Sequence, residues 1–209
     1  MRDLVLIGGG GHASDVLAAI EAMNAVEPRF RVIGYLSDDA SAVQRLERRG
    51  VLRLGRPEDI AAHPDAGVVL AIGYPTVRAQ VEGRLGLAER WSPTIVHPSA
   101  VVGPGCSIGD GAVVLAGSTL SPDVQIGAHA HVSQLCPIGH DVVVGTMSGV
   151  LPGAVISGDA HIGARAMIGA GATVLQGLTV GDDAVVGAGA LVTKDVPAGV
   201  VAKGSPARW

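Results

Sequence analysis

Residues 124–145 read VQIGAHAHVSQLCPIGHDVVVG, and every sixth residue from Ile126 is aliphatic. The same step of six runs from Val96 to Val192, and all 17 positions on it are Val, Ile or Leu. The residue two places earlier is Ala, Ser or Cys in 13 of the 16 repeats from Ala100 onward. A short fixed period of this kind is typical of a β-helix, in which repeated units stack as coils. The sequence therefore predicts a left-handed parallel β-helix of hexapeptide repeats, a triangular prism with 18 residues in each coil.

The composition agrees with thin, repetitive layers and excludes several classes of function. The chain has 209 residues, of which 48% are hydrophobic but only 2% aromatic, so Val, Ile, Leu and Ala must supply the core. A net charge of −4 without a basic run argues against nucleic-acid binding. No apolar run approaches the ~18 residues of a membrane span, and MRDLVLIGGGGH is too short and glycine-broken for a signal peptide. Cys106 and Cys136 fit no metal or disulfide pattern, so we expect a cytoplasmic protein.

Glycine recurs directly after the aliphatic residue of the repeat, as at Gly103, Gly127 and Gly145. Glycine adopts backbone conformations that strain other residues. We therefore expect these glycines at the tight corners of the prism.

Residues 1–92 are expected to form a separate small α/β domain ahead of the prism, which takes residues 93–209. Short apolar segments alternate there with helical ones, a pattern that favours a parallel sheet covered by helices. The expected strands are DLVLI, FRVIGYL, VLRLG and GVVLAIGY, and the expected helices follow the first glycine turn and lie within PEDIAAH and YPTVRAQVEGRLGL.

The turn after the first strand carries a nucleotide-binding pattern. Gly8, Gly10 and Ala13 match G-x-G-x-x-A between a strand and a helix, and acids follow the second strand. Such a turn holds phosphate at the start of a helix, and the acid holds a ribose. Because about 90 residues are few for a dinucleotide fold, a single nucleotide of a sugar nucleotide fits better. The residues expected around one crevice at the carboxyl ends of the strands are Gly10, Gly11, His12, Ser37, Asp38 and Gly73.

The order GGGGH, YLSDD, AIGY and then an unbroken prism containing IGHDVVVG resembles a known family. These are the hexapeptide-repeat sugar acyltransferases of the sialic acid O-acetyltransferase and UDP-N-acetylbacillosamine N-acetyltransferase type. The resemblance covers essentially the whole chain, including the closing VAKGSPAR. It implies a homotrimer with active sites between neighbouring prisms, and direct transfer of an acetyl group from acetyl-CoA to a UDP- or dTDP-linked amino sugar.

The resemblance also implies roles for individual residues. His140 matches the general base and Asp141 the acid that orients it. A histidine with an ordinary pKa near 6.5 can take a proton from a sugar ammonium at neutral pH. The residues matching the acetyl-CoA site are Gly149, Gly158, Ala170, Ala188 and Lys203.

Two positions depart from the pattern of the family. Ser133 stands where members often carry Asn, and Gly149 stands where many carry a histidine that contacts the acetyl donor. We expect backbone groups near Gly158 to replace that histidine. Both departures bear on how acceptor and donor are held.

Three alternatives remain open at this point. O-acetylation of a sugar such as a sialic acid would use the same base. A zinc enzyme of the carbonic anhydrase type would need three imidazoles converging across a subunit face, and the spacing of His129, His131 and His140 does not resemble a usual ligand set. A non-enzymatic nucleotide-sugar-binding scaffold is the third. Outside that zinc arrangement we expect His129, His131 and His161 to lie at the surface of the coils, and we expect no metal.

Overall fold

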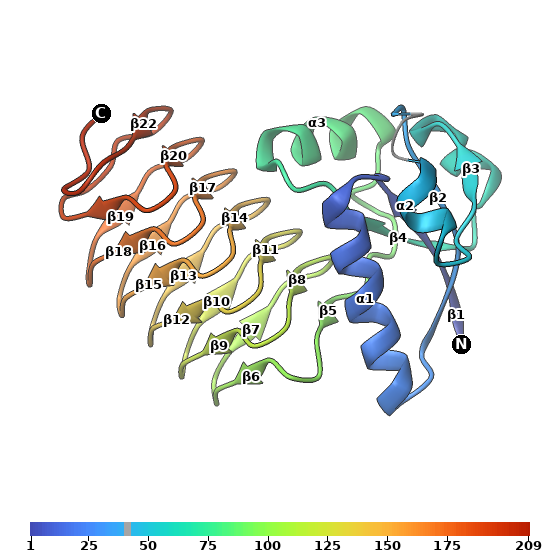
Figure 1. Ribbon diagram of the computed structural model, residues 1–209, viewed down its shortest axis with the longest axis horizontal. Coiled ribbons are helices and arrows are strands. Elements are labelled where there is room, and N and C mark those ends of the chain that lie inside the picture. The colour runs from blue at the N-terminus through green and yellow to red at the C-terminus, as the bar shows by residue number, and fades with distance from the viewer. Residues whose placement is uncertain (40–42) are drawn as a thin grey trace.

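The computed structural model describes residues 1–39 and 43–209, and shows a small α/β domain beside a long prism of stacked coils (Figure 1). The domain contains β1 (Arg2–Ile7), α1 (Gly11–Val26), β2 (Phe30–Leu36), α2 (Val43–Glu47), β3 (Arg53–Gly55), the 3₁₀ helix η2 (Pro57–Ala62), β4 (Gly67–Leu70) and α3 (Pro75–Leu85). Its four parallel strands have the order β3-β2-β1-β4. The predicted strands are confirmed, although the helix expected in PEDIAAH is a short 3₁₀ helix that begins at Pro57.

The two faces of this sheet are covered differently. Val16, Leu17 and Ile20 of α1 pack on the face that carries Leu4 and Leu6, because they recur on one side of the helix. Val5 and Ile7 point to the other face, where η2 and α3 cover them. The cluster under α1 also includes Ile95, Val113 and Leu115 of the prism, so the two parts of the chain share apolar packing.

The prism has three flat walls, which we name the first, second and third face in chain order. The first face contains β5 (Ile95–Val96), β8 (Val113–Val114), β11 (His131–Val132), β14 (Gly149–Val150), β17 (Met167–Ile168), β20 (Val185–Val186) and β22 (Val201–Ala202). The second contains β6 (Val101–Val102), β9 (Thr119–Leu120), β12 (Pro137–Ile138), β15 (Val155–Ile156), β18 (Thr173–Val174) and β21 (Leu191–Val192). The third contains β7 (Ser107–Ile108), β10 (Gln125–Ile126), β13 (Val143–Val144), β16 (His161–Ile162) and β19 (Thr179–Val180).

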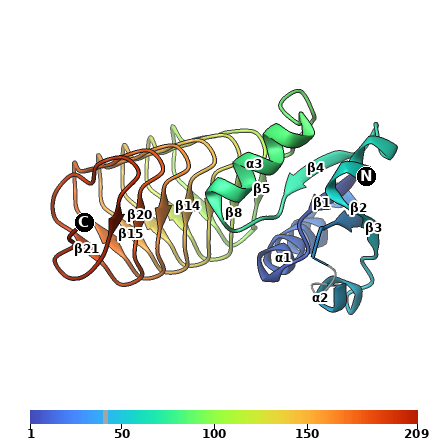
Figure 2. The same cartoon turned by 90° about the horizontal axis from the view of Figure 1, so that it is seen from above.

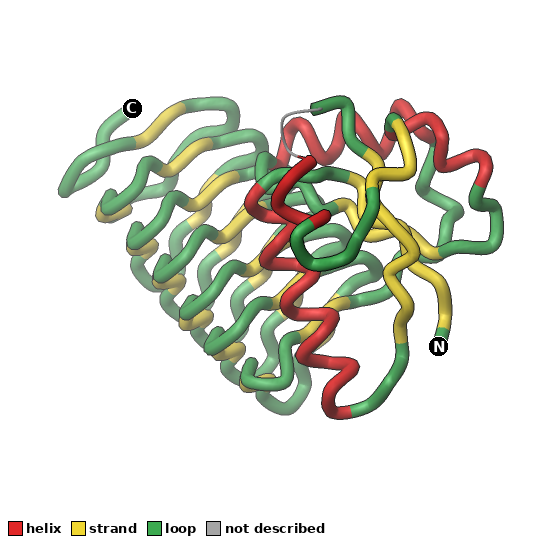
Figure 3. Tube along the Cα trace, turned by 45° about the vertical axis from the view of Figure 1, so that its right-hand side comes forward, coloured by secondary structure: helices red, strands yellow, loops and turns green. Residues whose placement is uncertain are grey.

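Each strand pairs in parallel with the strand one coil away, as Val132 pairs with Val150 and Ile138 with Ile156. The aliphatic residues of the repeat point inward and form one continuous core, together with the small residues two places before them. The predicted 18-residue coil is therefore confirmed. Figure 3 shows the coils as a regular stack with the helices gathered at one end.

The corners differ from the expectation for glycine. Gly127 has no left-handed backbone, and a Cβ atom there would lie 2.5 Å from the backbone nitrogen of Thr146 in the next coil. Glycine after the aliphatic residue is thus required by the close approach of successive coils. The left-handed positions lie two residues further on, and many are not glycine, as at Leu135, Asp141 and Asp159.

The α/β domain lies on the first face of its own prism. The outward residues of that face meet it in sequence: Ile95 and Val113 pack under α1, His131 meets His12, and Gly149 meets Pro75 at the start of α3. Figure 2 shows α3 beside the coils at the end of the prism that adjoins the α/β domain. In the described ranges 1–39 and 43–209, no helix has both the length and the apolar character needed to cross a membrane.

Candidate functional site

The crevice predicted from the glycine turn is present between β1 and β4. In the order β3-β2-β1-β4 the chain reverses its direction of addition between these two strands, and ligands of such sheets bind at that point. A cavity of about 290 Å³ opens there, lined by Gly8, Gly10, Gly11, His12 and residues 71–74. Helix α1 begins at Gly11 without a side-chain cap, so its first N–H groups are available to an anionic ligand.

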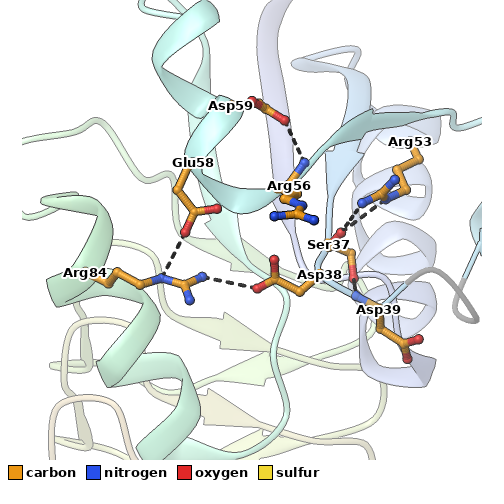
Figure 4. Close-up of polar contacts among 8 residues, drawn as sticks. All are labelled: Ser37, Asp38, Asp39, Arg53, Arg56, Glu58, Asp59 and Arg84. Carbon is orange, nitrogen blue, oxygen red and sulfur yellow. Dashed lines mark hydrogen bonds and ion pairs between the residues drawn. The ribbon is translucent and has the colours of Figure 1, made fainter.

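Ser37 and Asp38 do not line this cavity, although the sequence placed them there. They follow β2, which lies on the far side of β1 from β4. Asp38 accepts a hydrogen bond from Arg84 at 3.2 Å, and Arg84 also contacts Glu58 (Figure 4). Ser37 is buried, and its carbonyl oxygen accepts hydrogen bonds from Arg53. Asp38 therefore links α3 and, through Arg84, η2 to the end of β2, whereas Ser37 is held by Arg53 of β3.

A larger hollow of about 470 Å³ lies at the amino ends of the strands, beside Asp3 and Arg31. It is at the wrong end of a parallel sheet for a nucleotide, and Arg31 there is already paired with Asp3. A second, mainly apolar cavity of about 220 Å³ is lined by Gly73, Tyr74, Leu151 and Met167. Because it shares Gly73 and Tyr74 with the crevice, it extends the crevice onto the first face of the prism.

His140 and Asp141 stand together at an exposed corner. The Nδ1 atom of His140 lies 2.7 Å from the Oδ2 atom of Asp141, and each side chain is 54% exposed. Asp141 has a left-handed backbone, with φ of 58°. The hydrogen bond to Asp141 raises the pKa of His140, and the charges of Asp159 and Asp141 add to the effect.

Gly158 lies directly beneath the imidazole of His140. A Cβ atom at Gly158 would be 2.5 Å from Nε2 of His140, so only glycine lets the ring lie over the next coil. With Nδ1 committed to Asp141, Nε2 is the nitrogen that can accept a proton. Asp159, which the sequence reading missed, repeats the position of Asp141 one coil later; the 18-residue step between two aspartates was the available signal.

Ligand atoms of His140, Asp141 and Asp159 all lie within 4.8 Å of one another. In the part of the chain that the structure describes, this is the one group of side chains close enough to share a cation. All three residues are exposed, and exposed acids of this kind are common without an ion. We therefore assign no metal to the group.

His140 and the crevice lie on opposite sides of one chain. The corner of His140 joins the second and third faces, because it follows β12 and precedes β13. The crevice residue His12 contacts the first face through His131 of β11. In a triangular prism the edge between two faces is opposite the third, so the core of the prism separates His140 from its own crevice. One chain does not bring these two halves together.

The residues matched to acetyl-CoA are also divided between edges. Ala170 and Ala188 are exposed one coil apart at the edge between the first and second faces, near Lys203, whose Cβ atom would lie 3.3 Å from a Cβ atom added at Gly187. Gly158 is at the edge of His140. Gly149 is buried in β14, where a Cβ atom would lie 3.2 Å from Pro75. A side chain at this position would thus press against the start of α3.

Ser133, the other departure, is buried at the first–second edge. Its carbonyl oxygen accepts a hydrogen bond from Ser118 Oγ at 2.6 Å. Ser133 therefore stands away from the corner of His140 within one chain.

His129 and His131 are buried, contrary to the expectation of surface positions, whereas His161 is exposed as expected. Their exposed fractions are 8% and 2%, because the α/β domain covers the first face and the edge beside it. Burial lowers the pKa of both imidazoles, that of His131 well below its ordinary value. His129, His131 and His140 lie on three different parts of the prism. The three imidazoles proposed for zinc therefore do not converge in one chain.

Arg78 is the second residue that the sequence reading missed. It is fully buried on α3, and its guanidinium donates to the carbonyl oxygens of Ile72, Gly73, His129, Met147 and Ser148. Within residues 1–39 and 43–209 it has no carboxylate partner, and burial lowers its pKa to about 9. An arginine between two apolar segments gives no sequence signal for such a role.

Comparisons with known proteins agree with both parts of the fold. Residues 3–85 match the family described as PglD N-terminal domain, and residues 159–194 match the bacterial transferase hexapeptide (six repeats). The chain is 31% identical over 120 residues to UDP-N-acetylbacillosamine N-acetyltransferase of Bacillus subtilis; this segment is 56% of the chain and 52% of that relative. The chain thus spans about half the length of this curated relative.

Two solved structures are similar over nearly their whole length. The acetyltransferase domain of PglB from Neisseria gonorrhoeae, in complex with acetyl coenzyme A, is 28% identical with a TM-score of 0.87, covering 99% of this chain and 98% of that one. A histidine-to-asparagine mutant of perosamine N-acetyltransferase from Caulobacter crescentus, in complex with CoA and GDP-perosamine, is 30% identical with a TM-score of 0.86. That match covers 100% of this chain and 96% of the other.

A prism of hexapeptide coils with an exposed, carboxylate-bound histidine, joined to an α/β domain with an anion-binding turn, defines a hexapeptide-repeat acyltransferase. The chain belongs to the family of sugar O/N-acyltransferases that includes UDP-N-acetylbacillosamine N-acetyltransferase. The fold class predicted from the sequence is confirmed.

Proposed function

We propose that the protein transfers an acetyl group from acetyl-CoA to the amino group of a nucleotide-linked amino sugar, with His140 as general base. The observation that carries the proposal is the His140–Asp141 pair, which leaves Nε2 free at an exposed edge. The chemistry of the relatives supports it, since one solved structure holds acetyl coenzyme A and another holds CoA and GDP-perosamine.

The reaction needs one proton to be moved at Nε2 of His140. The amine nitrogen of the sugar attacks the carbonyl carbon of the thioester, and Nε2 takes the proton that the nitrogen loses. The carbon–sulfur bond breaks, and the leaving thiolate of CoA takes up the proton that Nε2 received, which returns His140 to its neutral form. Asp141 holds the ring through Nδ1 and stabilises the imidazolium that forms. Because its pKa is raised, His140 is a stronger base than an ordinary histidine and takes a proton from the amine more readily.

The opposite placement of base and crevice supports a site shared between copies of the chain. We propose a homotrimer in which the edge of one prism, with His140 and Gly158, faces the crevice of a neighbour. Residues 1–92 of that neighbour then hold the nucleotide at Gly10, Gly11, His12 and Gly73. Ala170, Ala188 and Lys203 line the path of the CoA arm, with the backbone at Gly158 close to the thioester; Gly149, buried beneath Pro75, lies outside this path.

In this proposal Ser37 and Asp38 lie at the margin of the nucleotide site. For Asp38 to reach a ribose, its contact with Arg84 at 3.2 Å must open. The side chains of Arg84 and Asp38 are each about half exposed, so the contact between them contributes little to stability and breaks at little cost in free energy.

The test is release of CoA from acetyl-CoA with a panel of acceptors. The panel contains UDP-, dTDP- and GDP-linked amino sugars, together with free and CMP-linked sialic acid. Release with one nucleotide amino sugar supports N-acetylation and identifies the acceptor. Release with a sialic acid alone would replace the proposal by O-acetylation, and binding of nucleotide without any release would favour a scaffold.

Replacing Asp141 by asparagine is expected to move the acid limb of the kcat/KM profile to lower pH. His140 acts only when neutral, so activity is lost as the pH falls through its pKa. Asp141 raises that pKa, and the amide of asparagine lacks the negative charge, so the pKa of His140 falls in the variant. The plateau rate at high pH is expected to fall as well, because a weaker base remains. An unchanged acid limb would remove Asp141 from its assigned role.

A further inference from the structure

Two imidazoles from distant parts of the chain meet at the wall of the crevice. Nε2 of His12 and Nδ1 of His131 are 2.7 Å apart, a hydrogen-bond distance, and the rings are stacked with centroids 4.9 Å apart. His12 lines the crevice, whereas His131 is the outward residue of β11 on the prism. The contact is thus a direct polar link between the crevice and the first face.

Both rings are neutral at physiological pH. Burial lowers the pKa of His12 to about 4, and the positive charge of Arg78 adds to this. The same two causes, burial first, hold the pKa of His131 well below its ordinary value. Since each neutral imidazole carries one proton, only one proton can lie between Nε2 of His12 and Nδ1 of His131. The question is which ring donates it.

The environment of the outer nitrogens answers this question. Nε2 of His131 is fully buried and has no hydrogen-bond partner among residues 1–39 and 43–209. If His12 were the donor, His131 would carry its proton at this Nε2 and bury an unpaired N–H group. A buried N–H group without a partner is rarer in proteins than an unpaired acceptor. His131 therefore carries its proton at Nδ1 and donates it to His12.

The consequence reaches the ligand side of His12. With Nε2 of His12 accepting, the proton of His12 is at Nδ1. This atom has no protein partner in the described part of the chain, and the ring lines the cavity next to the first turn of α1. An N–H donor beside a helix amino terminus suits an oxygen of a phosphate group.

We propose that His131 is a positioning residue, which donates from Nδ1 to Nε2 of His12 and so fixes His12 as an Nδ1–H donor for a phosphate oxygen of the nucleotide sugar. The inference rests on the proposed function for the identity of the ligand. Its tautomeric part concerns the protein alone.

The first experiment measures the tautomers without any substrate. Nitrogen-15 chemical shifts of histidine-labelled full-length protein distinguish protonated from unprotonated ring nitrogens, and a His12→Gln variant assigns the His12 signals. The expected result is a protonated Nδ1 and an unprotonated Nε2 on His12 in the native protein. A protonated Nε2 on His12 would overturn the inference, whether or not the protein acetylates a sugar.

The second experiment separates positioning from packing. His131→Leu removes the donor, whereas the side-chain amide of His131→Gln can replace it. With the acceptor found in the panel, KM for the nucleotide sugar is expected to rise roughly three- to tenfold in His131→Leu, as for one lost hydrogen bond, with kcat changed less than about twofold. His131→Gln is expected to recover most of the loss. His161→Leu, an exposed histidine of the third face, serves as the control and is expected to change neither constant.

Two kinetic results would contradict the role assigned to His131. Equal KM values in native protein and His131→Leu would overturn the inference. Equal losses in His131→Leu and His131→Gln would do the same, because they would indicate packing alone. Thermal denaturation of each variant shows whether it is folded, and a variant that does not fold leaves the tautomer measurement on the native protein as the deciding one.

Discussion

Replacing His140 by alanine is expected to lower kcat for acetyl transfer by about 10²- to 10⁴-fold, the usual contribution of a general base. Nε2 of His140 is the nitrogen left free by the bond from Nδ1 to Asp141. Asp141 is held at Nδ1 of His140, so its carboxylate is not placed to substitute for the imidazole as the base. Steady-state release of CoA, measured at saturating acetyl-CoA and acceptor, gives the comparison.

The fold should survive this change. The side chain of His140 is 54% exposed and packs over Gly158, so its removal opens no cavity in the core. The thermal midpoint of the variant is expected to match that of the native protein. His161→Ala, at another exposed position of the prism, is expected to keep full activity. Near-normal turnover in His140→Ala would remove His140 from the mechanism.

The same variant tests the shared site. Gly10→Leu places a large side chain in the crevice, where the backbone now leaves open space. Each variant alone has one defective half in every site. If base and crevice come from different copies, mixed assemblies of the two variants contain some sites with both halves intact, and activity returns. If both halves come from one chain, coexpression leaves the activity no higher than that of the separate variants.

The prism could be predicted almost completely from the sequence. The junction between the prism and the α/β domain could not. A coil of 18 residues leaves the same kind of residue at each inward position, as from Val132 to Val150, so the period is visible in one sequence. The corner of His140 was likewise predictable, because a His-Asp dipeptide interrupts an aliphatic repeat. Gly158 was assigned to the acetyl donor by resemblance, and the structure places it beneath the base.

The burial of His131 and Arg78 depends on docking between segments far apart in the chain. His131 occupies an outward position of a coil, which without the α/β domain would face solvent. Arg78 bonds to Met147 and Ser148, which are 69 and 70 residues away. Asp38 is a further example. Its position after a strand suggested a ribose contact, but in the structure its carboxylate is bound by Arg84 of α3. Contacts between such distant segments produce no periodic pattern in the sequence.

Replacing Arg78 by methionine is expected to lower the free energy of unfolding by about 3–5 kcal/mol, because several buried carbonyl oxygens lose a charged donor at once and each such loss costs about 1–3 kcal/mol. Methionine has a similar length, so it fills most of the space and the effect reports on hydrogen bonding rather than on a cavity. The carbonyl oxygens of His129, Met147 and Ser148 would each lose a donor at 2.8–2.9 Å in a buried region, and among the described residues only that of Ser148 keeps a second donor, the N–H of His131. These three carbonyls belong to the prism, while Arg78 belongs to α3, so the loss also loosens the two parts from each other.

Chemical denaturation at one fixed protein concentration measures the effect, since association of subunits contributes to apparent stability. Arg84→Met is the matched control: it lies on the same helix, but its contacts with Asp38 and Glu58 are exposed and are expected to contribute less than about 1 kcal/mol. Arg78→Lys keeps the charge but lacks the planar fork that reaches several carbonyls at once, so it is expected to recover only part of the loss. Arg78→Met could lower the free energy of unfolding no more than Arg84→Met does. Burial of the guanidinium would then cost as much as its hydrogen bonds contribute. Apolar packing alone would hold the α/β domain on the first face.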